Sequence, residues 1–237
     1  GFLADRFHVR KVIMANGALI SLTILVLINI LALSSAVSID SRYVVMIFAG
    51  FLGIIFGGFI GLASALPGYF SDEYDLDPVR AGYYTAACVM VGSLMRPVGG
   101  MLADRVGGIR ALLMMYAIAS GCIAIVGLNL SDAWAALSLF VIAMLGLGMG
   151  NGAVFQLVPQ RFSREMGVMT GLIGMAGGVG GFILAAGLGA IKQHSGDYQL
   201  GLWLFAALCI LAWAGLFGVR HRWRTAWVPL GAGRARL

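Results

Sequence analysis

Arg96 is the residue whose chemistry fits its surroundings least well. The 237-residue chain contains 16 Lys and Arg and 10 Asp and Glu residues, and all except Arg96 lie in or beside short polar breaks between long apolar runs. Arg96 lies inside the apolar run 86–100. A guanidinium in the hydrocarbon of a bilayer costs about 2.5–3.5 kcal/mol or more, so it needs a partner or a water-filled cavity. Because no acidic residue lies in an apolar run, the predicted partner is an anion that binds and leaves.

The elements that must position Arg96 are long apolar helices. The composition is 60% hydrophobic and only 11% charged, with a mean hydropathy of +0.94, whereas an average soluble domain is about 25% charged. The apolar runs are long enough to cross a hydrocarbon core of about 30 Å. The sequence therefore predicts an all-α, polytopic membrane bundle of about seven helices, over residues 12–37, 44–70, 82–103, 111–129, 134–158, 167–189 and 199–219.

Other chemistries find little support in the sequence. Cys88, Cys122 and Cys209 lie in apolar runs and are interpreted as small core residues, without a disulfide or a metal site. The net charge of +6 comes from basic residues at helix ends and in the tail, which is typical of membrane topology and not of nucleic-acid binding. No nucleophile–base pair or cofactor loop is found, so we expect neither an enzyme nor a cofactor.

Arginines also indicate an orientation. The loops 104–110 and 159–166 and the tail 220–237 hold most of them, which predicts that these segments and the C-terminus are cytoplasmic, with 130–133 and 190–198 outside. Residues 1–43 do not fit, because three helices separate two similar basic loops that both look cytoplasmic. A missing, deleted or irregularly joined segment, or a helix that does not span, would each explain this.

The two similar loops share one motif. Gly1-Phe-Leu-Ala-Asp5-Arg6 closely matches Gly100-Met-Leu-Ala-Asp104-Arg105. Each copy is a helix end that runs into a tight charged loop, where an ordinary basic loop and a conformational element are both possible. The candidate residues are Gly1, Asp5, Arg6, Gly100, Asp104 and Arg105.

Two further stretches combine polar or small residues with an apolar span. The run 171–181 contains six glycines, which would weaken a soluble helix but allow close helix approach in lipid. The glycines either pack helices or give a neighbouring helix or small substrate a flat face. Asn151 and Gln156 lie in another span and need partners there, either a neighbouring helix or the lining of a translocation path.

Together these pieces resemble the nitrate/nitrite porter family of the major facilitator superfamily. The segments 57–61, 93–105, 150–156 and 171–182 are similar to its helix 7, its helix 8 with the following loop, its helix 10, and the second nitrate signature in its helix 11. The resemblance covers about 44–219, which would be the C-terminal six-helix half.

The resemblance implies a role for each candidate. Arg96 would grip the anion from helix 8, and the charged loop would act as a cytoplasmic latch. The family's second arginine, on helix 2, and its first nitrate signature, on helix 5, are not found here, so we expect a fragment whose N-terminal half is missing. The expected substrate-binding residues are Arg96, Asn151, Gly177, Gly178, Gly180 and Gly181.

The expected organisation has three parts. Residues 1–43 would hold a loop motif and one helix of an incomplete N-terminal half, residues 44–219 the transporter half, and residues 220–237 a basic cytoplasmic tail. The location implied is the inner membrane of a bacterium.

The expected function is membrane transport of nitrate or nitrite by alternating access. A planar guanidinium suits a flat oxyanion, and an unpaired buried arginine opposes the crossing of the empty site, which favours anion exchange. The acidic residues and the histidines lie in loops, but a proton relay in the missing half would allow symport. The alternatives are a transporter of the same fold for another small anion and a non-transporting membrane remnant.

Overall fold

The computed structural model describes residues 39–161 and 166–225. The predicted helix 12–37, the first loop motif with Gly1, Asp5 and Arg6, and the end of the tail from 226 lie outside the described residues. The chain divides into two units, Gly1–Phe48 and Ala49–Leu237. The site lies in the second unit.

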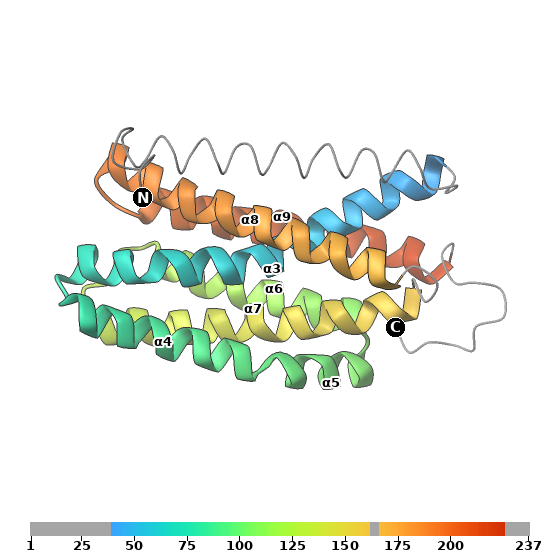
Figure 1. Cartoon of the computed structure of the whole chain (residues 1–237), viewed down its shortest axis with the longest axis horizontal. Coiled ribbons are helices and arrows are strands. Elements are labelled where there is room, and N and C mark those ends of the chain that lie inside the picture. Colours follow the sequence, from blue (N-terminus) through green and yellow to red (C-terminus); the bar gives the residue numbers. More distant parts are fainter. Residues whose placement is uncertain (1–38, 162–165, 226–237) are drawn as a thin grey trace, which may run out of the picture. The chain divides into compact units, whose positions relative to one another are not determined.

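The described residues form a helical bundle, which confirms the predicted all-α membrane class. Five segments are long and apolar enough to cross a bilayer among the residues described: Pro78–Val106, Gly108–Val126, Ala133–Val158, Ile173–Ser195 and Gln199–Gly218. The helices, labelled in Figure 1, are α3 (Ile39–Tyr74), α4 (Pro78–Leu94), α5 (Arg96–Val106), α6 (Gly108–Val126), α7 (Ala133–Arg161), α8 (Met166–Ser195) and α9 (Gln199–Thr225).

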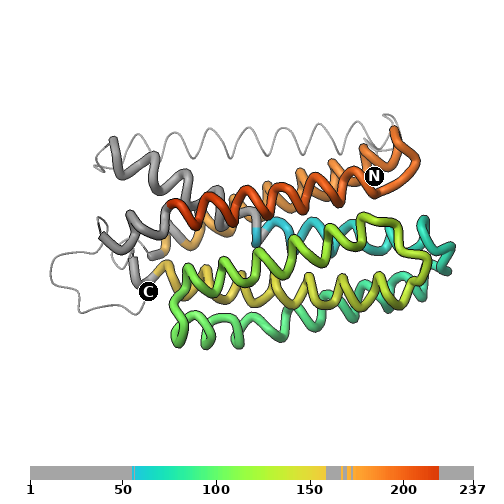
Figure 2. Tube along the Cα trace, turned by 180° about the vertical axis from the view of Figure 1, so that it is seen from behind, coloured from blue at the N-terminus to red at the C-terminus, as the bar shows by residue number. Residues whose placement is uncertain are grey.

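Helix α6 lies at the centre of the second unit. It packs against α7 on one side and α9 on another, and Figure 2 shows these helices running side by side. Helix α7 also packs along both α4 and α5. Helices α6 and α7 are thus the framework on which the segment with Arg96 is mounted.

Polar side chains define several helix ends. Asp77 caps α4, since its carboxylate accepts the Val79 N–H at 3.1 Å and Pro78 occupies the first turn. Asp132 does the same for α7, accepting the N–H groups of Trp134 at 3.1 Å and Ala135 at 3.2 Å. Helix α3 continues to Tyr74, so the break expected from Ser71 onward is shorter than predicted.

The predicted membrane span 82–103 is found within one spanning segment, Pro78–Val106, but this segment consists of two helices with a break at Met95. Pro97 explains the break: it has no N–H to donate to the Ser93 carbonyl, and its ring crowds that carbonyl. The Met95 N–H still bonds to Val91 O at 3.1 Å, and the Gly99 N–H bonds to Met95 O at 3.0 Å. The change of direction between α4 and α5 is visible in Figure 1. Arg96 therefore stands at the first residue of α5, directly after the bend.

Candidate anion-binding site

Arg96 packs against an aromatic ring of another helix. Its guanidinium carbon lies 4.7 Å from the centre of the Phe59 ring on α3. Phe59 is buried, with 4% of its surface exposed. The geometry is that of a cation–π contact, which is strongest where water is excluded. Sequence reasoning did not name Phe59, although it lies within the 57–61 segment that resembles the family's helix 7.

The guanidinium also keeps an unused donor. Arg96 Nε is buried and has no hydrogen-bond partner within the described ranges. The single ion pair found there joins Lys192 and Glu73, so no described carboxylate neutralises Arg96. A buried donor without a partner costs about 1–3 kcal/mol, and more when it is charged. The arrangement suits a ligand that brings negative charge and acceptor oxygens.

Asn151 is the second polar group inside the bundle. It is fully buried on α7, and both its Oδ1 and Nδ2 atoms lack a hydrogen-bond partner among the described residues. Its neighbour Gly152 lies directly against the backbone of Arg96, since a Cβ atom there would collide with the Arg96 carbonyl oxygen. A buried amide with a free donor and a free acceptor can bind a polar ligand or water.

The six glycines of the run 171–181 on α8, here called the glycine stripe, lie in different environments. A Cβ atom on Gly57 of α3 would lie 2.8 Å from Gly180 C and Gly181 N and 2.9 Å from Gly177 O, so these glycines form the crossing of α3 and α8. A Cβ atom on Gly178 would instead meet no atom of the described residues within 4 Å. No described contact joins the stripe to Arg96 directly. The link runs through α3, where Phe59 lies two residues after Gly57.

The charged loop after α5 is held by α7. Gln156 Nε2 donates a hydrogen bond to Asp104 Oδ1 at 2.6 Å, and Gln156 Oε1 is buried without a partner in the described part of the chain. Arg105 is exposed, and Gly100 lies next to Gly152, whose Cβ would come within 2.9 Å of the Gly100 nitrogen. The polar residue expected in the span at 156 thus contacts the loop motif itself.

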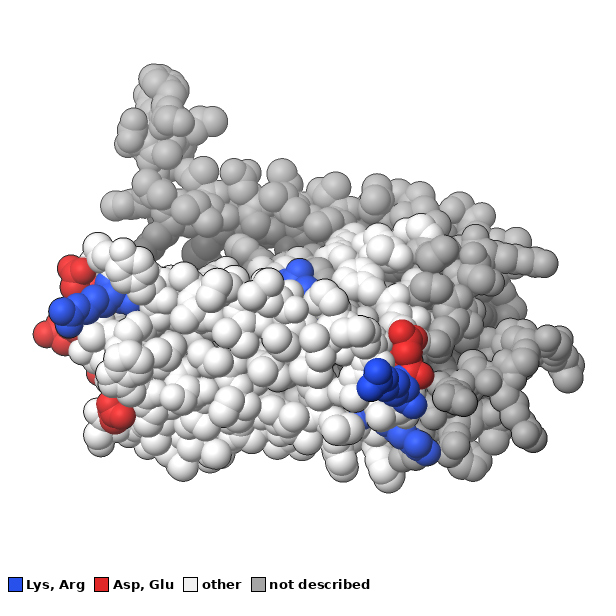
Figure 3. All heavy atoms as spheres, turned by 90° about the horizontal axis from the view of Figure 1, so that it is seen from below, with Lys and Arg blue, Asp and Glu red and all other residues white. Residues whose placement is uncertain are grey.

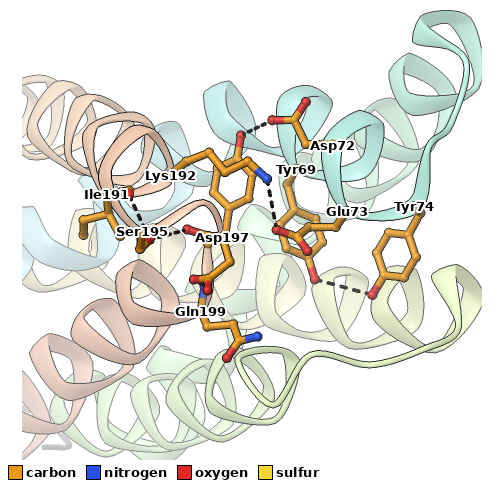
Figure 4. Close-up of polar contacts among 10 residues, drawn as sticks. Tyr69, Asp72, Glu73, Tyr74, Ile191, Lys192, Ser195, Asp197 and Gln199 are labelled. Carbon is orange, nitrogen blue, oxygen red and sulfur yellow. Dashed lines mark hydrogen bonds and ion pairs between the residues drawn. The ribbon is translucent and has the colours of Figure 1, made fainter.

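The opposite end carries a larger polar cluster, shown in Figure 4. Lys192 Nζ lies 3.4 Å from Glu73 Oε1 and 5.0 Å from the centre of the Tyr198 ring. The Tyr198 hydroxyl donates to Asp72 Oδ2 at 3.1 Å. Burial raises the pKa of Tyr198 to about 12, and the hydrogen bond to Asp72 adds to the effect. The cluster ties the end of α3 to the α8–α9 turn.

The breaks 130–133 and 190–198, which are predicted to share one side of the membrane, both contact the end of α3. Tyr74 donates to Leu130 O at 2.9 Å, so the α3 and α6–α7 turns meet at the end that carries Lys192, whereas Asp104 and Gln156 meet elsewhere. Figure 3 shows charged side chains gathered towards the two ends of one face, with largely uncharged surface between them. Which end faces the cytoplasm stays a prediction.

The chain is similar to curated nitrite and nitrate transport proteins. The chain is 35% identical over 157 residues to the nitrite extrusion protein of Bacillus subtilis (strain 168), covering 63% of this chain and 37% of that protein. It is 31% identical over 160 residues to the probable nitrate transporter NarT of Staphylococcus aureus (strain JH9), covering 66% of this chain and 39% of that protein. The chain thus spans about two fifths of the length of these curated relatives.

The relatives confirm the resemblance to nitrate/nitrite porters. The profile of the Major Facilitator Superfamily matches residues 31–185, which is more than half of the chain and includes Arg96, Asn151 and the glycine stripe. Together with the apolar helices, this match makes the protein a multi-pass membrane protein of a transporter family. The chain belongs to the major facilitator superfamily.

Proposed function

We propose that this chain forms one half of a membrane transporter for nitrate or nitrite, with Arg96 gripping the anion. The observation that carries the proposal is the unmatched charge of Arg96: its Nε is buried without a partner in the described ranges, and its guanidinium rests on Phe59. A flat oxyanion accepts two parallel hydrogen bonds from a guanidinium. The relatives named for nitrite extrusion and nitrate transport point to the same substrate class.

Asn151 and the open glycine of α8 complete the proposed site. Asn151 offers a donor and an acceptor that no described residue uses, and the bare backbone of Gly178 borders open space, since a Cβ there would meet no described atom within 4 Å. Gly177, Gly180 and Gly181 shape the same region indirectly, since they allow α3 to approach α8 at Gly57.

The transport cycle we propose is alternating access with anion exchange, in the cytoplasmic membrane of a bacterium. Two six-helix halves would rock around a site near the midplane. When the site is empty, the Arg96 charge has no counter-ion from the described residues, which penalises the crossing of the empty carrier. The bound anion removes this penalty, so each crossing would require an anion.

The loop motif would control this motion. The hydrogen bond between Gln156 and Asp104 holds the loop to α7 in the present conformation. Its breakage and reformation would be part of the switch between the inward-facing and outward-facing states.

The experiment that tests the function is anion binding followed by counterflow. The purified 237-residue chain, in detergent or nanodiscs, is titrated with nitrate and nitrite by calorimetry. Arg96→Lys keeps the charge but loses the planar pair of donors, so we expect affinity to fall by about 10- to 100-fold, as for a lost charged hydrogen bond. Arg110→Lys, a matched change at an exposed residue of α6, should bind like the wild type.

Proteoliposomes extend the test to transport and to the alternatives. Vesicles that hold the transporter with its partner half and are loaded with nitrite should take up labelled nitrate, and uptake should not require a pH gradient. Uptake that depends on a pH gradient and not on internal anion would support proton symport instead. If formate or acetate competes as well as nitrite does, the protein is a carrier of another small anion. If the Arg96→Lys variant exchanges nitrate at the wild-type rate, Arg96 does not bind the anion.

A further inference from the structure

We infer that one face of α7 sets the position of the Arg96 guanidinium, so that Gly152 and Gln156 are positioning residues of the anion site. The inference rests on the proposed function, because it concerns the affinity of the same site. Neither residue touches the guanidinium in any described contact. Gly152 meets the backbone at Arg96, and Gln156 bonds to the side chain of Asp104 on the same helix.

The first observation is a match between two rows of residues. On α7, Gly148, Gly152 and Gln156 recur every four positions and therefore lie on one face of the helix. Each meets a residue of the α4–α5 segment: Gly148 meets Gly92, Gly152 meets Arg96, and Gln156 meets Asp104. Gly92, Arg96 and Asp104 are themselves separated by multiples of four. The face of α7 thus follows α4–α5 past the bend at Met95.

The second observation is that Gly148 and Gly152 meet the α4–α5 segment backbone against backbone. A Cβ atom on Gly148 would collide with the Gly92 carbonyl oxygen, and one on Gly152 with the Arg96 carbonyl oxygen. The reverse also holds, since a Cβ on Gly99 would collide with the Met149 carbonyl oxygen. Backbones in such contact cannot move closer, and no flexible side chain lies between them to absorb a displacement. The glycines therefore determine how deep α5 sits in the bundle.

The third observation concerns the bend. Because Pro97 has no N–H to donate to the Ser93 carbonyl, one backbone hydrogen bond across the bend is missing, and the segment gains less stiffness from its own backbone at Arg96 than a continuous helix would. The contact with Gly152 supplies a fixed point at that residue. At Asp104, about two turns after Arg96 on α5, the bond from Gln156 supplies a second fixed point.

The two fixed points define the orientation of α5. Arg96 is its first residue, and Asp104 lies near its end at Val106. A short rigid helix held at both ends presents its first side chain, Arg96, in one place, as binding of an anion by its guanidinium requires. Misplacement of about 1 Å in such a grip can cost about 100-fold. Substitutions at residue 156 are therefore expected to change the affinity for the anion by shifting α5.

The decisive variant is Gln156→Glu, which has almost the same shape as the wild type. It places two carboxylates where one amide donates to one carboxylate, so the fixed point at Asp104 is lost. Nitrate affinity of the 237-residue chain, measured by calorimetry, should fall by about 10-fold or more. Adding Asp104→Asn restores a donor–acceptor pair with reversed direction and should restore affinity. A residue with a general folding role would not be rescued in this way.

A second variant tests the glycine contact. Gly152→Ala should weaken nitrate binding by a similar factor. Gly121→Ala is the matched control, because a Cβ atom on Gly121 of α6 would meet no atom within 4 Å in the part of the chain that the structure describes. The midpoint of thermal unfolding, recorded for every variant, identifies any protein that failed to fold.

The outcomes separate this inference from the proposed function. If Arg96→Lys loses nitrate while Gln156→Glu and Gly152→Ala keep wild-type affinity, the inference is wrong and the anion site stands. If the wild type neither binds nitrate alone nor exchanges it in proteoliposomes with its partner half, the proposed function fails. The positioning is then judged by the rate at which Arg96→Cys reacts with a charged thiol reagent. Gly152→Ala should change that rate and Gly121→Ala should not; equal rates would overturn the inference.

Discussion

The guanidinium carbon of Arg96, on α5, lies 4.7 Å from the ring centre of Phe59, on α3. Two residues before Phe59, Gly57 is the point where α3 crosses the glycines of α8. The same short stretch of α3 therefore contacts both features that the sequence marks as unusual. Helix α3 connects the arginine to the glycine stripe, which otherwise share no described contact.

Phe59→Leu should weaken nitrate binding while the protein remains folded. The ring covers one face of the guanidinium, and its loss admits water that competes with the anion. A cation–π contact is worth about 0.5–2 kcal/mol, so affinity should drop by roughly 2- to 30-fold in a calorimetric titration. Leu208→Ala, at an exposed position of α9, is the control. Unchanged affinity in Phe59→Leu would show that the ring serves packing alone.

Asn151→Leu should separate binding from stability. Both polar atoms of Asn151 are buried without described partners, so an apolar residue of similar volume should leave the thermal midpoint unchanged or raise it. The same change should lower nitrate affinity if the amide faces the anion. Loss of stability without loss of affinity would instead indicate that Asn151 bonds to a buried water or to a residue outside the described ranges.

Gly57→Ala and Gly178→Ala should have opposite effects on stability. The methyl group at 57 would meet the α8 backbone at 2.8–2.9 Å, so the helices must separate, at a cost of about 1–3 kcal/mol. The methyl group at 178 meets no described atom within 4 Å and raises helix propensity by up to about 1 kcal/mol. Thermal unfolding in detergent measures both. Equal midpoints for the two variants would contradict the crossing at Gly57.

Tyr198 should make the protein sensitive to alkaline pH. Its pKa is raised from 10.0 to about 12, because burial and the hydrogen bond to Asp72 favour the neutral hydroxyl. The folded state holds this proton more tightly than the unfolded state, so the contribution is complete below pH 10.0 and is lost as pH rises to about 12.

The check is the thermal midpoint as a function of pH for the wild type and Tyr198→Phe. Tyr198→Phe should lose less stability than the wild type across this alkaline window. Parallel curves would mean that Tyr198 ionises as it does in the unfolded chain.

Much of the architecture follows from local sequence. Long apolar runs require a bilayer, and Asp77 with Pro78 starts a helix wherever the chain lies. The sequence predicted the span but not its break at Met95, because hydropathy is continuous there and the effect of Pro97 depends on what surrounds the bend. The unusual status of Arg96 was evident from composition, since a charge in an apolar run is costly in any fold of this class.

The partners of these residues were decided by tertiary structure alone. Phe59 is 37 positions from Arg96, and Gln156 is 52 positions from Asp104. Helical periodicity shows which face of a helix is apolar or small, but similar faces can pair in many ways, and only the assembled bundle selects one. The sequence by itself thus determined that the chain is a membrane bundle with one unmatched arginine. The packing of α3, α5 and α7 decided that this arginine rests on Phe59 and is seated against Gly152, because the glycines allow those backbones to approach closely.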